Sequence, residues 1–118
     1  MYLLIDTNES RFSLFEPKDS LTDLPWVNVQ RDKSLTREIR GQKKHFKGIV
    51  VLQGKGVFSQ TREGVVFANI FRQAKQVPIL SVTEEELSSK NAESLEGELL
   101  GSTQQVLLPH YFAEPNIT

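Results

Sequence analysis

The first thirty residues alternate between short apolar runs and polar breaks, and this pattern predicts strands. Tyr2–Asp6 is short, apolar and rich in strand formers, and Arg11–Phe15 alternates between polar and apolar positions. The polar residues 7–10 between them are typical of a turn, so the two runs predict a β-hairpin with a loop longer than the tightest type. Trp26–Gln30 alternates again and is a third strand candidate.

The middle of the chain predicts helices that alternate with buried strands. Ser34–Lys44 is compatible with a helix, but its apolar stripe is thin. The continuous apolar run Ile49–Leu52 predicts a central parallel strand that is buried on both faces. Thr61–Ala74 carries apolar residues at helical spacing, and Pro78–Val82 is the next buried strand.

The last third of the chain is more polar. Thr83 and Glu86 form a capping-box pattern that opens a short helix through about Lys90. Residues 91–105 are polar and contain Gly and Ser, so we expect a loop with some helix there, followed by a tail over about 106–118.

The predicted order of elements indicates a fold class. An antiparallel meander followed by alternating strands and helices gives a mixed sheet that is covered on two faces. This order is found in ribonuclease-H-like and actin-like ATPase domains. We therefore expect an α/β, ribonuclease-H-like (actin-like ATPase) domain with a mixed five-stranded sheet and helices on both faces, formed by residues 1–118 as one unit.

Composition narrows the class of protein. The chain has 118 residues, 38% hydrophobic and 25% charged, with net charge −1 and no cysteine, which excludes a disulfide scaffold and a thiolate metal site. The apolar runs are far too short for a membrane span, and the N-terminus lacks the basic start of a secretory signal. We expect a cytoplasmic protein without membrane contact.

A glycine-rich stretch, GKGVFSQTREG at 54–64, follows the apolar run of residues 49–52. It resembles the Gly-Pro-Gly-Ser-Phe-Thr-Gly-x-Arg-x-Gly motif of the TsaB (YeaZ) family, which belongs to the actin-like ATPase superfamily. The residues in register are Gly54, Gly56, Phe58, Arg62 and Gly64, with Ser59 in place of threonine and with departures at Lys55, Val57 and Gln60. Leu4–Thr7 and Val77–Val82 are also similar to the corresponding segments of that family.

The resemblance implies a non-catalytic role. In that family TsaB supports TsaD without catalysing a step itself, and the two proteins act with the ATPase TsaE to make the threonylcarbamoyl modification of adenosine 37 in certain tRNAs. The resemblance also implies that this chain contacts a TsaD-like protein or forms a homodimer. The residues implied in that contact are Gly54, Gly56, Phe58, Ser59, Arg62, Gly64, Phe67 and Phe71. Family members are roughly twice as long and have two lobes, so we expect one lobe here and no interdomain cleft.

Other interpretations of these residues stay open. The glycine loop could contact a phosphate, or it could only turn the chain. Asp6 could be a metal-linked carboxylate, or it could cap the hairpin turn. His45 and His110 lack the spacing of paired metal ligands, and Ser59 and Ser81 have no evident base, so we expect no metal, cofactor or catalytic triad. Residual nucleotide binding or peptidase-like activity is a further alternative.

Charge is unevenly distributed along the chain. Residues 31–47 hold seven Lys or Arg against two acids, and residues 84–98 hold six Glu against one Lys. The first segment could bind RNA, with Phe46 as a stacking group, or it could be a solvated surface. The candidate RNA-binding residues are Arg37, Arg40, Lys43, Lys44 and Lys47. The two segments could also face each other, within one molecule or between two.

The apolar residues at helical spacing in 61–74 also have two interpretations. They form either core or a dimer face, and the second interpretation requires Val66, Phe67 or Phe71 to be exposed.

Overall fold

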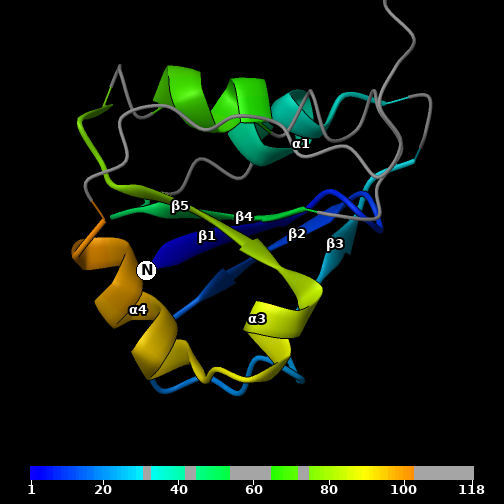
Figure 1. Cartoon of the computed structure of the whole chain (residues 1–118). Coiled ribbons are helices and arrows are strands. Elements are labelled where there is room, and N and C mark those ends of the chain that lie inside the picture. The colour runs from blue at the N-terminus through cyan, green and yellow to red at the C-terminus, as the bar shows by residue number, and fades with distance from the viewer. Residues whose placement is uncertain (31–32, 42–44, 54–64, 72–74, 103–118) are drawn as a thin grey trace, which may run out of the picture.

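Five strands form one mixed sheet in the order β3-β2-β1-β4-β5 (Figure 1). This computed structural model describes residues 1–30, 33–41, 45–53, 65–71 and 75–102. The strands are β1 (Tyr2–Asp6), β2 (Arg11–Phe15), β3 (Val27–Asn28), β4 (Ile49–Gln53) and β5 (Ile79–Thr83). The helices are α1 (Leu35–Gly41), α3 (Glu84–Ser88) and α4 (Ala92–Leu100), and residues 65–71 are helical as well.

The strand directions follow from the pairings. β1 pairs antiparallel with β2, which pairs antiparallel with β3. On its other side β1 pairs parallel with β4, which pairs parallel with β5. Strand β2 therefore runs against the other four, and the predicted mixed five-stranded sheet is confirmed.

Both faces of the sheet carry a cluster of buried apolar residues. Side chains alternate between the two faces along each strand, so neighbouring residues belong to different clusters. Leu3 and Ile5 pack on one face with Ile39 of α1 and Phe67 of the helical residues 65–71. Tyr2 and Leu4 pack on the other face with α4, whose buried residues are Ala92, Leu95 and Leu99. Figure 1 shows α1 above the sheet and α3 and α4 below it, so helices cover both faces as predicted.

One element is shorter than predicted, and another is more helical than predicted. β3 is only two residues long, since it pairs with β2 through Val27 and Asn28 alone. The segment from residue 91, where we expect a loop with some helix, is helical over Ala92–Leu100. Asn91 caps this helix, because its side chain accepts from the Ser94 amide while the Ser94 hydroxyl accepts from the Asn91 amide.

Across the described part of the chain, no helix combines the length and the apolar character that crossing a bilayer requires.

Candidate functional site

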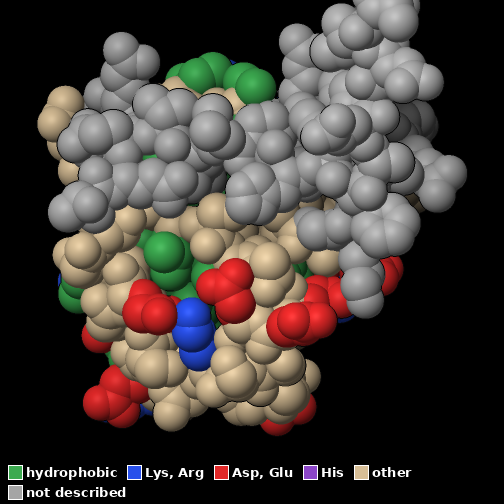
Figure 2. Space-filling model, in the orientation of Figure 1, with side chains coloured by type: hydrophobic (Ala, Val, Ile, Leu, Met, Phe, Trp, Pro, Cys, Tyr) green, Lys and Arg blue, Asp and Glu red, His purple; other side chains and the backbone are tan. Residues whose placement is uncertain are grey.

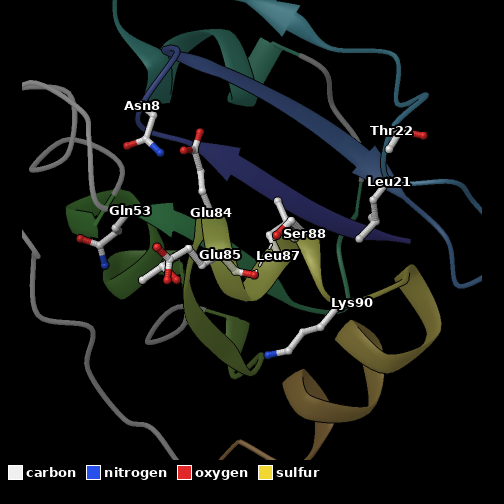
Figure 3. A pocket seen from close by; sticks show the side chains of 10 residues that line it. Asn8, Leu21, Thr22, Gln53, Glu84, Glu85, Leu87, Ser88 and Lys90 are labelled. Carbon is white, nitrogen blue, oxygen red and sulfur yellow. Dashed lines mark hydrogen bonds between the residues drawn. The ribbon is translucent and has the colours of Figure 1, made fainter.

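The parallel strands β1, β4 and β5 all end at the same edge of the sheet, and a cleft lies there (Figure 3). In open α/β sheets, ligands bind at the carboxyl ends of strands where the chain changes its direction of progress across the sheet. Here that point is β1, which has β2 on one side and β4 on the other. The cleft measures about 710 Å³ and is lined by Asn8, Leu21, Thr22, Gln53, Thr83, Glu84, Glu85, Leu87, Ser88 and Lys90.

Asp6, at the end of β1, closes the hairpin rather than facing solvent. Its carboxylate is buried, and Oδ1 accepts hydrogen bonds from the Asn8 and Glu9 amides at 2.9 and 3.2 Å. Oδ2 pairs with Arg11 Nε at 2.9 Å, and the Arg11 guanidinium lies 4.1 Å from the ring centre of Trp26. The structure therefore supports the interpretation of Asp6 as the cap of the turn.

Buried polar side chains join the strands beneath the cleft. The Thr7 hydroxyl donates to the Leu52 carbonyl at 2.7 Å, and the Gln53 amide donates to the Ser81 hydroxyl at 2.8 Å. These bonds link β1 to β4 and β4 to β5, which makes the floor of the cleft rigid. Ser81, considered above as a nucleophile, is thus a hydrogen-bond partner of Gln53.

The rim of the cleft is acidic. Glu84 and Glu85 are exposed at the start of α3, where Thr83 and Glu86 form the predicted capping box. Among the described lining residues the one cation is Lys90, and its ammonium is engaged by Glu98 and, at 3.9 Å, by Glu86. This charge disfavours a phosphate and favours a neutral or cationic ligand.

A second hollow lies on the opposite face of the sheet, between α1 and the helix that contains residues 65–71. It measures about 250 Å³, and we call it the aromatic hollow; it is lined by Ile39, Arg40, His45, Phe46, Phe67, Phe71 and Lys75. Phe71 is its central ring, with Phe46 at 5.3 Å and Phe67 at 5.7 Å between ring centres. The hollow brings Phe46, from the basic segment for which RNA binding is one of two interpretations, beside two basic side chains.

Only some of the predicted site residues are described by the structure, and these differ in exposure. Gly54, Gly56, Phe58, Ser59, Arg62 and Gly64 lie outside the described residues, as do Lys43, Lys44 and His110. Phe67 is only 5% exposed and Phe71 is half-buried, so both rings pack against the core and Phe67 offers almost no surface to a partner. On the same helix the exposed apolar residues are Val66 and Ile70, at 46% and 54%.

The basic and acidic segments do not face each other within the molecule. Arg37, Arg40 and Lys47 are exposed, and α1 packs on one face of the sheet through Ile39. α4 packs on the other face, and Figure 2 shows acidic side chains gathered over the half of the molecule where α3 and α4 lie. An intramolecular pairing of the two segments is therefore wrong for the described residues.

Sequence reasoning missed some contributors to these sites. Lys75 was not among the predicted site residues, although the spacing of four between positions 67, 71 and 75 in the sequence is a signal that could have found it. Leu21 and Thr22 come from an irregular segment after β2, and no pattern in the sequence signals their approach to α3. Among the described residues, no group of three or more His, Cys, Asp or Glu is arranged to hold a metal ion.

Comparisons of this chain with protein-family models, with curated proteins and with solved structures found no match.

Proposed function

We propose that this chain is a TsaB-like interaction protein of the cytoplasm, built on a ribonuclease-H-like domain. It supports a TsaD-like protein, together with a TsaE-like ATPase, in forming threonylcarbamoyladenosine in tRNA. Its contribution is surface recognition rather than catalysis.

The observation that carries the proposal is the position of the glycine motif within the sheet order. The order is β3-β2-β1-β4-β5 with β2 alone reversed, as expected for the ribonuclease-H-like class. β4 ends at Gln53 and the next described residues, 65–71, are helical, so the motif 54–64 stands in the sequence between the fourth strand and those helical residues. That is the interval in which the TsaB family carries its motif.

The engagement of Asp6 supports a non-catalytic role. In actin-like ATPases a carboxylate at the end of the first strand is often linked to a metal. Here both oxygens of Asp6 are used by the hairpin amides and by Arg11. A carboxylate that is buried and satisfied in this way contributes to the geometry of the turn.

The surface we assign to the partner is the outer side of the helix after the motif. Val66 and Ile70 are one turn apart and exposed, while Phe67 and Ala68 of the same helix are buried. Exposed apolar residues at this spacing form the kind of anchor that a partner covers.

Binding to a TsaD-like protein from the same source tests the proposal. We expect the full chain to form a complex in isothermal titration at micromolar concentration. The double variant Val66→Glu, Ile70→Glu should weaken it at least about tenfold, because each carboxylate would be desolvated at the interface. Leu100→Glu is the matched control, since Leu100 is equally exposed but lies on α4, across the sheet. No complex with the unaltered chain would refute the proposal.

A further inference from the structure

The aromatic hollow joins features that are usually separate: an apolar aromatic interior and a basic rim. We propose that it binds one base of a single-stranded nucleic acid, while the adjoining phosphates contact Arg40 and Lys75. This inference goes beyond the proposed protein contact and does not depend on it.

The aromatic part of the hollow is suited to stacking. Phe71 contacts both Phe46 and Phe67, with an angle of 45° between the Phe46 and Phe71 rings. Phe67 is buried in the core, whereas Phe46 and Phe71 are only half-buried and line the hollow. Every nucleobase presents a π face, so accessible rings of this kind bind bases with little dependence on sequence.

Phe46 is also held in place. The Lys47 amide donates to the Met1 carbonyl at 2.9 Å, and the Leu3 amide donates to the Gly48 carbonyl at 3.0 Å. These bonds attach the segment that carries Phe46 to the start of β1. A ring that is carried on an anchored backbone and packed against Phe71 loses less freedom when a base stacks on it than a ring on a free loop, which favours binding.

The size of the hollow fits part of a nucleotide. Sites for drug-sized ligands have volumes of roughly 300–1,000 Å³. At about 250 Å³ the hollow has room for one planar ring system, so the sugar and phosphate of the same nucleotide would remain at the rim. The rim residues Arg40 and Lys75 are both exposed.

The rim has the charge that a phosphate requires. Among the described residues, neither Arg40 nor Lys75 takes part in an ion pair, and the lining of the hollow contains no acid. This contrasts with Lys90 in the cleft, which two glutamates engage. Cations without acid partners release counterions when they contact phosphates, which provides binding energy.

The exposed cations beyond the hollow favour a strand over a free nucleotide. Lys33, Arg37 and Lys47 are exposed and flank the residues of the hollow along the chain. A mononucleotide would leave them unused, whereas the backbone of a longer strand can contact several of them. In a duplex the bases are stacked inside, so only a single strand can place a base on Phe46.

Fluorescence anisotropy with a fluorescein-labelled twelve-residue oligouridylate tests this proposal on the full chain. We expect binding that weakens roughly tenfold between 50 and 200 mM salt, as for two or three phosphate contacts to a single strand. Phe46→Leu keeps an apolar side chain but removes the π face, and it should weaken binding at least about fivefold.

Charge variants provide the matched comparison. Lys75→Gln should weaken binding about threefold or more and reduce its salt dependence, whereas Lys18→Gln should change neither. Lys18 is an equally exposed lysine in the turn after β2, outside the hollow. Circular dichroism and thermal melting of each variant establish that the fold is intact.

Four outcomes would overturn the proposal. The first is no binding at 100 μM protein. The second is unchanged affinity in Phe46→Leu, which would indicate charge alone. The third is displacement of the oligonucleotide by polyglutamate as readily as by unlabelled oligouridylate, which would indicate an acidic protein as the ligand. The fourth is uridine monophosphate binding as tightly as the oligonucleotide, which would indicate a free nucleotide.

Discussion

The two helical layers of this domain both bury apolar side chains against the same sheet but present opposite charges to solvent. The layer of α1 and helical residues 65–71 exposes Arg37 and Arg40, and among the described residues these cations have no acid partner. The layer of α3 and α4 carries six glutamates, and its lysine, Lys90, is paired. The core therefore fixes the fold on both sides, whereas the outer faces are suited to different ligands.

The number of buried side chains differs between α4 and α1. α4 buries Ala92, Leu95 and Leu99. α1 is shorter, and of its described side chains only Ile39 is fully buried. α4 is thus docked through more buried side chains than α1, whereas the basic layer is also held by the buried residues Val65, Phe67 and Ala68.

Truncation of the central anchor of each layer should give the largest effects. Leu95→Ala should cost about 2–5 kcal/mol of unfolding free energy, because it leaves a cavity under a rigid helix. Ile39→Ala should cost about 2 kcal/mol, since α1 can detach locally. Urea denaturation measures both costs, and hydrogen exchange should show loss of protection confined to α1 in Ile39→Ala. Equal costs with global loss in both variants would contradict the difference in docking.

α4 approaches the sheet so closely at Gly48 that no side chain fits there without movement of a neighbour. A Cβ at this position would lie 2.6 Å from Leu99 Cδ2 and 3.3 Å from the backbone oxygen of Pro78. Gly48→Ala should therefore cost about 1–3 kcal/mol through overpacking. The cost should fall in a Leu99→Ala background, which a double-mutant cycle by urea denaturation would reveal. Additive costs would show that Leu99 is not the limiting contact.

The Tyr2 hydroxyl of β1 interacts with Glu96 of the acidic layer, and this interaction should make stability depend on pH. A hydrogen bond to Glu96, together with burial, raises the pKa of Tyr2 from 10.0 to about 12. Because the folded-state pKa lies above the unfolded value, the stabilisation is complete below pH 10 and is lost as pH rises toward 12. Thermal melting between pH 9 and 12 should show this loss, and Tyr2→Phe should lack it. An identical pH profile in the variant would remove Tyr2 as the cause.

The smallest effects concern surface charge. Lys90→Gln should destabilise the protein by up to about 1 kcal/mol, because it removes contacts with Glu98 and Glu86. Arg40→Gln should change stability by less than about 0.5 kcal/mol, since Arg40 has no ion pair among the described residues. A larger loss in Arg40→Gln would mean that the basic layer uses its charge for folding rather than for binding.

The sequence predicted the strands and the mixed sheet well, because each rests on a local pattern. β1 and β2 begin and end at the predicted residues, and the continuous apolar run at 49–52 is buried on both faces of β4. The capping box at Thr83 and Glu86 also formed as predicted. These signals involve neighbouring residues, so tertiary packing had little opportunity to override them.

The predictions were incomplete where composition hid a pattern or where tertiary contacts decided the outcome. α4 is polar overall, yet Ala92, Leu95 and Leu99 are spaced as one helical face behind an Asn91 cap. β3 is short, and just before it Trp26 lies against the Arg11 guanidinium. The cleft joins the hairpin turn, the segment after β2 and α3, which are distant in the sequence. No local pattern could predict such a convergence.

The pairings of β1 have a consequence for the order in which this chain assembles. Partners across β1 and β2 are at most thirteen positions apart, from Tyr2 to Phe15, whereas Leu3 and its β4 partner Ile49 are forty-six apart. Local closure is faster than distant closure, so the hairpin should form early, with Asp6 fixing its register. Until β4 arrives, the other side of β1 has no strand beside it. During that interval the edge of β1 in a second copy of the chain can compete for the position of β4. Slow growth of the expression host at moderate temperature should therefore favour correct folding over aggregation.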